Sequence, residues 1–192
     1  MEEPNFFRRG WEAMKNRGMV FASTKFLVNK VLNQSHLLPL IKTPLHVVEV
    51  GAGSGGFTKG LLPFMEQNKK MILTIVELEE KYRKRLEAIT KKFENRVTII
   101  IGSVTDLPEL ITQKADVVVS ALPFGSLSEK LRVTALDNMY NVLKQGGEYL
   151  QFQYLLSKLS QFRKKFGQKG NVSWTPLNLP PAFVYKFVKT EA

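Results

Sequence analysis

The fold is decided by LHVVEVGAGSGG, residues 45–56. The first six of these residues are mostly apolar and β-branched, which is typical of a strand buried on both faces. The glycines that follow let the backbone turn sharply and approach a ligand with no Cβ in the way. In an open parallel sheet, ligands bind where such a strand passes into a helix, so this turn is where we expect a site.

Strand-like and helical stretches alternate from this turn onward. Helices are expected at about 56–67, 79–93 and 128–143, and further strands at 71–76, 97–101, 116–120 and 148–152. This alternation predicts an α/β domain with a parallel sheet covered by helices on both faces. Two last strand-like runs, 172–174 and 183–188, are joined by a proline-containing segment and predict a terminal antiparallel hairpin.

The chain is long enough for one well-buried core. It has 192 residues, of which 44% are hydrophobic, and we expect a single domain over residues 1–192. Two helices are expected at the N-terminal end, at 4–17 and 23–33, where apolar side chains recur at helical spacing. We expect this helical segment, residues 1–34, to cover the site.

The charge of the chain is strongly positive. Lys and Arg number 28 against 17 Asp and Glu, so a surface with a formal net charge of +11 should attract nucleic acid or an anionic membrane. The chain has no cysteine, which removes disulfides, thiolate metal sites and cysteine nucleophiles. Because the sequence shows neither an export signal nor a run of membrane-spanning length, we expect a cytoplasmic protein that needs no metal.

Acidic residues at the ends of the first two strands predict the kind of ligand. A carboxylate at Glu49 would repel a pyrophosphate but suits the cationic methionyl end of S-adenosylmethionine. Glu77 ends the second strand, 26 positions after Gly51, where its carboxylate can accept both ribose hydroxyls of a nucleoside. Ser103 and Val104 follow the third strand and are expected to border the adenine. The alternative is that the glycines only make a turn and Glu77 only caps a helix.

These residues resemble the class I methyltransferases, together with Ser120-Ala121-Leu122-Pro123-Phe124 after the fourth strand and LKQGG at 143–147. The resemblance covers roughly residues 40–190. It implies a Rossmann-like three-layer sandwich whose seven-stranded sheet is mostly parallel with an antiparallel last strand, and it implies S-adenosylmethionine as methyl donor. The residues expected to bind this cofactor are Glu49, Gly51, Ala52, Gly53, Gly55, Phe57, Thr58, Glu77, Leu78, Ser103, Val104, Ser120, Ala121 and Leu122.

Four segments carry a finer resemblance. They are FF at 6–7 with Trp11, AST at 22–24, VVSALP at 118–123, and QFQY at 151–154 followed by NLPPAFVY at 178–185. Together they look like the bacterial phospholipid N-methyltransferases, which convert phosphatidylethanolamine toward phosphatidylcholine and are related to the ribosomal RNA adenine dimethylases. The resemblance implies N-methylation of phosphatidylethanolamine at a membrane surface.

Two basic amphipathic helices indicate membrane binding independently. In one, Leu155, Leu159, Phe162 and Phe166 form an apolar stripe, and the charges around it are all positive: Lys158, Arg163, Lys164, Lys165 and Lys169. Each such charge contributes about 1 kcal/mol at an anionic surface, so five would hold the protein there reversibly. The first helix could do the same through Phe7, Arg8, Trp11 and Lys15. We expect peripheral association with the inner face of the membrane; the alternative is that both stripes pack on the sheet.

Methyl transfer from a sulfonium is an in-line displacement, so the enzyme mainly has to place a nucleophilic nitrogen beside the methyl carbon. A primary ammonium must first lose a proton, which calls for a nearby acceptor. We expect that acceptor among Ser120, Gln153 and Tyr154, and we expect the ring of Phe124 to face the developing cation. The catalytic candidates are thus Tyr154, Ser120 and Phe124, and the substrate-binding candidates are Pro123, Phe124, Gln153 and Tyr154.

Other acceptors remain open at this point. The positive charge would also bind RNA phosphates. Adenine dimethylases, however, carry Asn-Leu-Pro-Tyr where this chain has Ala121-Leu122-Pro123-Phe124, so the polar residue that would hold a base amine is missing. A soluble small-amine methyltransferase would use the same glycine turn without needing basic amphipathic helices. A binding protein without catalytic activity is the remaining alternative.

Overall fold

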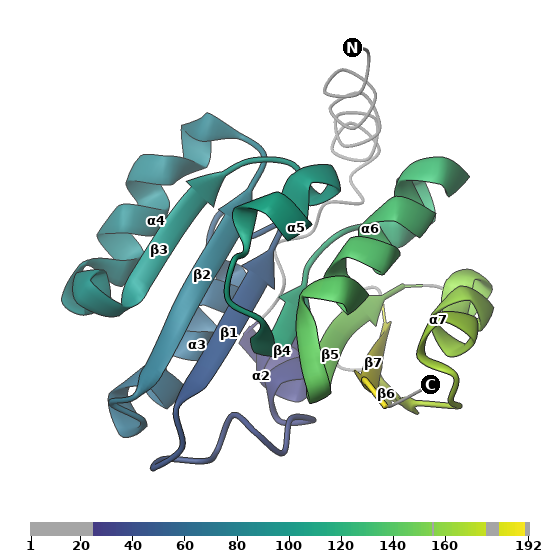
Figure 1. Ribbon diagram of the computed structural model, residues 1–192, viewed down its shortest axis with the longest axis horizontal. Helices are drawn as coiled ribbons and strands as arrows, with labels where there is room; N and C mark the ends of the chain where they lie inside the picture. The colour runs from purple at the N-terminus through teal and green to yellow at the C-terminus, as the bar shows by residue number, and fades with distance from the viewer. Residues whose placement is uncertain (1–24, 155, 176–180, 191–192) are drawn as a thin grey trace.

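In the computed structural model, which describes residues 25–154, 156–175 and 181–190, seven strands form one sheet between two layers of helices (Figure 1). The strand order is β3-β2-β1-β4-β5-β7-β6. Strands β1 to β5 are parallel, and β7 is antiparallel to both of its neighbours, β5 and β6. The strands are β1 Leu45–Val50, β2 Met71–Glu77, β3 Val97–Ile101, β4 Ala115–Ser120, β5 Leu143–Gln153, β6 Asn171–Thr175 and β7 Ala182–Val188. This is the predicted seven-stranded α/β sandwich.

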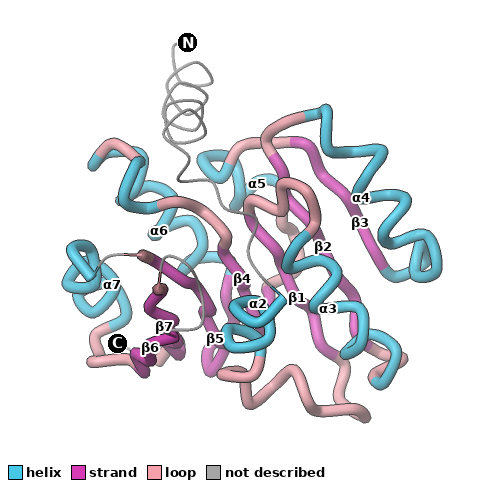
Figure 2. Tube along the Cα trace, turned by 180° about the vertical axis from the view of Figure 1, so that it is seen from behind, coloured by secondary structure: helices cyan, strands magenta, loops and turns pink. Residues whose placement is uncertain are grey.

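In the described part of the chain, helices cover both faces of the sheet (Figures 1 and 2). One face carries α2 Lys25–Leu32, α3 Gly56–Gln67 and α4 Arg83–Thr90; the other carries α5 Leu107–Leu110, α6 Glu129–Val142 and α7 Leu159–Phe166. Side chains of β1 alternate between the two cores, because Leu45 and Val47 face α2 and α3 whereas Val48 and Val50 face α6. All six residues of β1 are buried, which explains the mostly apolar pattern of this strand.

Glycines let the helices approach closely on the α3 face. Gly55 precedes α3 with φ +83°, and a Cβ there would lie 2.5 Å from Ile89 Cδ1. Gly60 is the contact point for α2, since a Cβ on Gly60 would lie 2.3 Å from Cγ1 of Val28. Helix α2 confirms the helix expected at 23–33, and its buried face is Leu27, Val28, Val31 and Leu32.

Two expected elements have different limits in the structure. The helix expected over 79–93 is continuous only over α4, with 3₁₀ turns at Glu80–Tyr82 and Lys91–Arg96, because Phe93 has a non-helical φ of −121°. Strand β5 begins at Leu143, five residues before the expected strand at 148. Its early part stays in the sheet because Gly146 N–H donates to Lys189 O at 2.8 Å and Lys189 N–H donates to Gly147 O at 2.9 Å.

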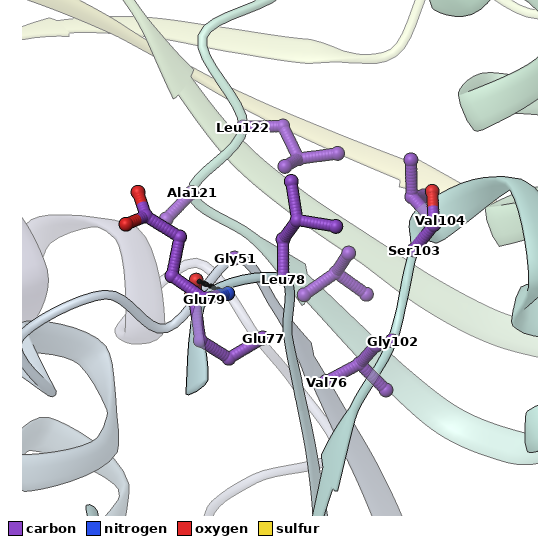
Figure 3. A pocket seen from close by; sticks show the side chains of 11 residues that line it. Gly51, Val76, Glu77, Leu78, Glu79, Gly102, Ser103, Val104, Ala121 and Leu122 are labelled. Atoms are coloured by element: carbon purple, nitrogen blue, oxygen red, sulfur yellow. Dashed lines mark hydrogen bonds between the residues drawn. The ribbon is translucent and has the colours of Figure 1, made fainter. Parts of the chain in front are cut away.

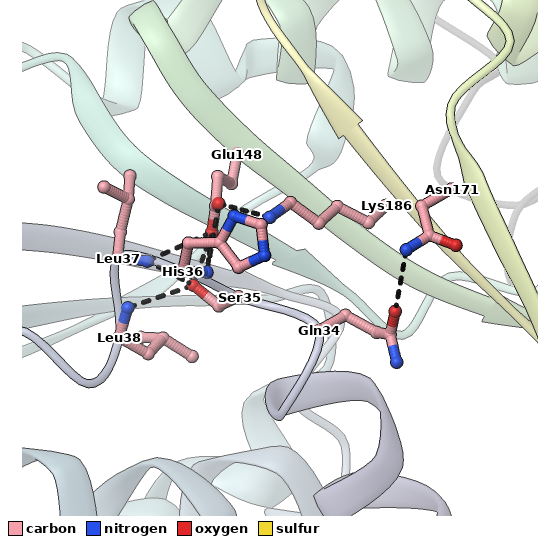
Figure 4. A network of polar contacts seen from close by, with 8 residues as sticks. All are labelled: Gln34, Ser35, His36, Leu37, Leu38, Glu148, Asn171 and Lys186. Carbon is pink, nitrogen blue, oxygen red and sulfur yellow. Dashed lines mark hydrogen bonds and ion pairs between the residues drawn. The ribbon is translucent and has the colours of Figure 1, made fainter.

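A buried carboxylate anchors the loop after α2 to the sheet (Figure 4). Glu148 on β5 forms an ion pair with Lys186 on β7 at 2.6 Å and accepts hydrogen bonds from Ser35 Oγ at 2.5 Å and His36 N–H at 3.1 Å. Burial alone would raise the pKa of Glu148, but these donors outweigh it and lower the pKa below its ordinary value. The end of the N-terminal segment is therefore fixed to the sheet. The helix expected at 4–17, with Phe7, Arg8, Trp11 and Lys15, lies outside the described residues.

None of the helices in the described part of the chain combines the length and the apolar composition that a bilayer crossing requires.

Candidate active site

A cleft opens at the carboxyl ends of β1, β2, β3 and β4, which is where the glycine turn predicts a ligand (Figure 3). Backbone from all four strand ends contributes to its wall. The lining residues are Val50, Gly51, Val76, Glu77, Leu78, Glu79, Gly102, Ser103, Val104, Ala121 and Leu122.

The glycine turn brings backbone, not side chains, to the cleft. Gly51 has φ +79°, and a Cβ there would lie 2.9 Å from Cδ2 of Leu122, so a side chain at 51 would push away the opposite wall. Gly53 also has a positive φ, +53°, and no atom lies within 4 Å of where its Cβ would be. The turn thus leaves open space beside a backbone that only glycine adopts easily.

Glu77 presents a fixed carboxylate to this cleft. One oxygen accepts a hydrogen bond from Gly53 N–H at 2.7 Å, and the other accepts one from Glu79 N–H at 2.9 Å. Burial raises the pKa of Glu77, although these backbone donors oppose the rise. Each carboxylate oxygen retains lone pairs, so the group can accept further hydrogen bonds from a ligand in the cleft.

Glu49 supports the site from beneath. It is fully buried, and it accepts hydrogen bonds from Thr58 N–H at 3.1 Å and Thr58 Oγ at 2.8 Å in the first turn of α3. Burial raises the pKa of Glu49 to about 7, and the nearby charge of Glu77 adds to the rise. Neither Glu49 nor Thr58 lines the cleft, so in this structure the pair fixes the start of α3 against β1.

The cleft brings together half of the residues expected to bind the cofactor. Those that line it are Gly51, Glu77, Leu78, Ser103, Val104, Ala121 and Leu122, whereas those that lie outside its lining are Glu49, Ala52, Gly53, Gly55, Phe57, Thr58 and Ser120. Four lining residues are not among those expected to bind the cofactor: Val50, Val76, Glu79 and Gly102. Each is adjacent in sequence to a predicted residue at a strand end. This place in the sequence is the signal by which they could have been predicted to line the cleft.

A buried polar network holds the loop that follows β4. Two glutamine amides of β5 donate to the same carbonyl, Leu122 O, from Gln151 Nε2 at 2.9 Å and Gln153 Nε2 at 3.1 Å. The Tyr149 hydroxyl donates to Gln151 Oε1, and Ser120 Oγ accepts from Leu122 N–H at 3.3 Å. Ser120 is fully buried in this network. The sequence placed Gln151 in the QFQY segment but gave it no role in the site.

The residues expected to bind the substrate separate into two groups. Gln153 ends β5 at the carboxyl edge, and Tyr154 follows it with its ring in edge contact with Phe152, 5.6 Å between centroids. Pro123 is half-buried in the loop after β4. Phe124 is fully buried, and its ring lies 4.9 Å from that of Phe162 in the core. This packing corrects the expectation that the Phe124 ring faces the acceptor amine.

Helix α7 also differs from its expected role. Phe162 and Phe166 are buried against aromatic rings of the sheet, with Phe166 at 5.1 Å from Phe187, so neither ring is available to a membrane. Lys165 forms an ion pair with Asp137 of α6 at 2.7 Å. Arg163 and Lys164 are exposed. The expected amphipathic helix therefore exists, but Leu159, Phe162 and Phe166 of its apolar stripe pack on the sheet and only part of its charge faces solvent. Leu155, the first residue of the stripe, lies outside the described residues.

The sheet order, the cleft at the strand ends and the fixed carboxylate of Glu77 in it together define a class I methyltransferase that uses S-adenosylmethionine. Residues 47–147, more than half of the chain, match the protein family described as "Methyltransferase domain". The chain therefore belongs to this family. It is similar to the ornithine lipid N-methyltransferase of Singulisphaera acidiphila, with 29% identity over 145 residues that cover 72% of this chain and 73% of that protein.

Solved structures show the same fold. TrmN from Thermus thermophilus superimposes with a TM-score of 0.68 at 12% identity, covering 89% of this chain, which spans 50% of that one. The N-methyltransferase NodS from Bradyrhizobium japonicum, solved in complex with S-adenosyl-L-homocysteine, has a TM-score of 0.63 at 16% identity, covering 85% of this chain and 86% of that one.

Proposed function

We propose that this enzyme methylates the primary amine of a membrane lipid, with phosphatidylethanolamine as the first acceptor to test. One observation carries the proposal: the sequence relative that covers most of the chain is named for methylating the nitrogen of a lipid. The surface charge supports it, because a formal charge of +11 favours anionic membranes over neutral solutes.

The cleft residues are proposed to hold the cofactor by its three parts. Glu77 accepts the ribose hydroxyls, Ser103 and Val104 border the adenine, and the backbone of Gly51 and Gly53 lies beside the methionyl end. The open space at Gly53 and the fixed carboxylate of Glu77 fit this ligand. When bound, S-adenosylmethionine supplies an electrophilic methyl group on a sulfonium, so the remaining task of the protein is to orient the amine.

Gln153 is proposed to orient that amine. Its NH₂ group donates to Leu122 O at 3.1 Å, which fixes the amide and leaves its carbonyl oxygen as an acceptor. An N–H of the acceptor amine bonded to this oxygen directs the nitrogen lone pair away from Gln153 and toward the methyl carbon. Tyr154, next in the chain at the same edge, is proposed to accept a second N–H and to pass the released proton to water.

Labelled S-adenosylmethionine tests the acceptor class. The enzyme is incubated in parallel with phosphatidylethanolamine liposomes, ornithine lipid liposomes, soluble ethanolamine and total RNA. Label in a lipid fraction is expected, and the split between the two lipids identifies the headgroup. Label confined to RNA would replace the proposal with RNA methylation, and label confined to ethanolamine would replace it with small-amine methylation.

A variant tests the role of Gln153. Gln153→Leu should lower kcat at least tenfold while the affinity for S-adenosylhomocysteine changes by less than about threefold, because Gln151 still holds Leu122 O. The matched control is Gln67→Leu, the same change at the exposed end of α3. An unaltered kcat in Gln153→Leu would remove this residue from the mechanism.

A further inference from the structure

The edge strand β6 carries a tryptophan that packing does not account for. Trp174 is 56% exposed, the highest value among the large hydrophobic side chains in the described part of the chain. It sits at the outer edge of the sheet, since β6 pairs only with β7 in the strand order. A half-exposed indole has both a large apolar face and one N–H donor, a combination suited to a boundary between apolar and aqueous surroundings.

We propose that Trp174 and the basic residues of α7 and the following turn form a surface that docks on an anionic lipid bilayer and presents the substrate site to it. The proposal rests on the lipid-methylating function proposed above and adds the face of the molecule that meets the membrane. It replaces the expected contacts of Phe162 and Phe166, which are buried.

Strand register places Trp174 beside the proposed acceptor site. Trp174 pairs with Phe183 on β7, and Phe183 pairs with Gln153 on β5. The three residues therefore form one row across the sheet, about 10 Å from its first strand to its last. Residues directly opposite in antiparallel pairs project from the same face, so Trp174 and Gln153 share the face that α7 covers. A bilayer in contact with Trp174 would lie within a headgroup's reach of Gln153.

The stretch of chain that contains Trp174 carries charge of a single sign. The sequence from Tyr149 to Thr190 contains no Asp or Glu, and within it Arg163, Lys164 and Lys169 are exposed. Lys164 lies on α7, and Lys169 lies in the turn that leads to β6. Each such cation near an anionic bilayer strengthens binding about fivefold. These cations, on α7 and in the turn before β6, are complementary to the charge of an anionic bilayer.

A second apolar side chain favours a bilayer over a nucleic acid as the partner. Leu156 is 42% exposed and begins the turn that leads from the carboxyl end of β5 into α7. Trp174 lies at the same carboxyl edge, in the row of Gln153. An indole could stack on a base, but an aliphatic side chain has no comparable partner in RNA, whereas both are buried at a lipid interface.

Fluorescence tests the docking surface directly. The chain has two tryptophans, Trp11 and Trp174, so Trp11→Phe leaves the second as the only indole emitter. Vesicles of phosphatidylcholine with phosphatidylglycerol should shift its emission to the blue, brominated lipids should quench it, and pure phosphatidylcholine should do much less. Emission that changes with total RNA and not with anionic vesicles would overturn the proposal, as would emission that changes with neither.

Flotation with matched variants tests the residues. Trp174→Ser, and separately Arg163→Glu with Lys164→Glu, should weaken binding to anionic vesicles at least tenfold. The controls are Ile41→Ser, a 53% exposed residue before β1, and Lys69→Glu with Lys70→Glu, which changes the net charge equally in the turn before β2. If the control variants weaken flotation as much as the test variants, binding depends on the overall charge or apolarity of the protein and not on this surface.

Activity separates this proposal from the proposed function. Trp174→Ser should lose most of its activity on liposomes but keep it on the same lipid dispersed in detergent micelles, and its affinity for S-adenosylhomocysteine should be unchanged. If the wild-type enzyme methylates no lipid in either form, the proposed function fails, while fluorescence and flotation still decide whether this surface binds a bilayer. Equal losses of Trp174→Ser in liposomes and micelles would overturn the docking role.

Discussion

Burial in the folded protein favours the neutral form of Glu49 up to about pH 7. Its pKa is raised to about 7 by burial, from an ordinary value of 4.5 that applies to the unfolded chain. Between about pH 5 and about pH 7 the folded protein therefore keeps a proton that the unfolded chain has released. The free energy of unfolding therefore falls as pH rises through this window, by up to about 3 kcal/mol, and then levels off.

Glu49→Gln should remove this dependence. An amide at 49 can accept from Thr58 N–H and donate to Thr58 Oγ, which keeps both contacts without a titrating group. Urea unfolding of the ligand-free protein should show the variant gaining stability relative to wild type as pH is raised from 5.5 to 8. Glu77 titrates in both proteins and so cancels in the difference. A constant difference across this range would show that Glu49 is ionised throughout.

Glu77 should control cofactor affinity more than stability. Removing its carboxylate in Glu77→Ala deletes the proposed acceptor of two ribose hydroxyls, and hydrogen bonds to a charged group contribute about 1.5–3 kcal/mol each. Calorimetry should therefore show at least a tenfold loss of affinity for S-adenosylhomocysteine. Glu80→Ala, a change of an exposed carboxylate three residues further along the chain, serves as the control and should bind normally.

At the scale of elements, the approach of α2 to α3 depends on Gly60. A Cβ there would lie 2.3 Å from Val28 Cγ1 and 2.9 Å from Leu32 Cδ1, both buried side chains of α2. Gly60→Ala gains up to about 1 kcal/mol in helix propensity, but forcing α2 outward costs about 1–3 kcal/mol. We expect a net loss of about 1 kcal/mol in the free energy of unfolding.

Denaturant melts measure this loss against a matched control. Gly125→Ala makes the same change in the loop after β4, where no atom lies within 4 Å of the added Cβ, and it should stay within about 0.5 kcal/mol of wild type. If Gly60→Ala proved more stable than wild type, helix propensity would outweigh packing and α2 would not lie as close to α3 as described.

The strands could be predicted from sequence because their pattern is local. The limits of β1 and β3 are those expected, and β2 and β4 extend by one residue, since a buried apolar run changes abruptly where it meets a turn. The start of β5 was not predictable, because Gly146 and Gly147 lie between the helix expected at 128–143 and the strand expected at 148–152. What holds them in the sheet is Lys189, more than forty residues further along the chain.

Two further features could not be predicted, because they too depend on contacts between residues that are distant in sequence. They are the partner against which the apolar face of α7 packs and the hydrogen-bond network around Leu122 O. An amphipathic stripe has one pattern whether it faces lipid or a sheet, and the rings that cover Phe162 and Phe166 come from β5 and β7. Likewise, Gln151 and Gln153 act on a backbone carbonyl, which leaves no signal in the side-chain pattern. Glu77 was predictable because the end of a strand is itself a position in the site.

At the scale of the molecule, cofactor binding and folding should be coupled. The cleft is built from the carboxyl ends of four strands, which belong to one sheet and whose side chains enter both cores. A ligand that bridges these ends binds only when the sheet is formed, so it stabilises the native state by mass action. A site confined to one peripheral loop would stabilise that loop without raising the free energy of global unfolding as much.

S-adenosylhomocysteine at about 100 times its Kd should therefore add about 2.7 kcal/mol to the free energy of unfolding and raise the Tm by about 5–10 °C. At the same concentration Glu77→Ala should show a much smaller rise, because its affinity is lower while its sheet is intact. NADH should produce no rise, since the carboxylate of Glu77, which already occupies the Gly53 N–H of this turn, would repel a pyrophosphate lodged beside it. A Tm that NADH raises as much as S-adenosylhomocysteine would show that the cleft recognises only the adenosine portion common to both ligands.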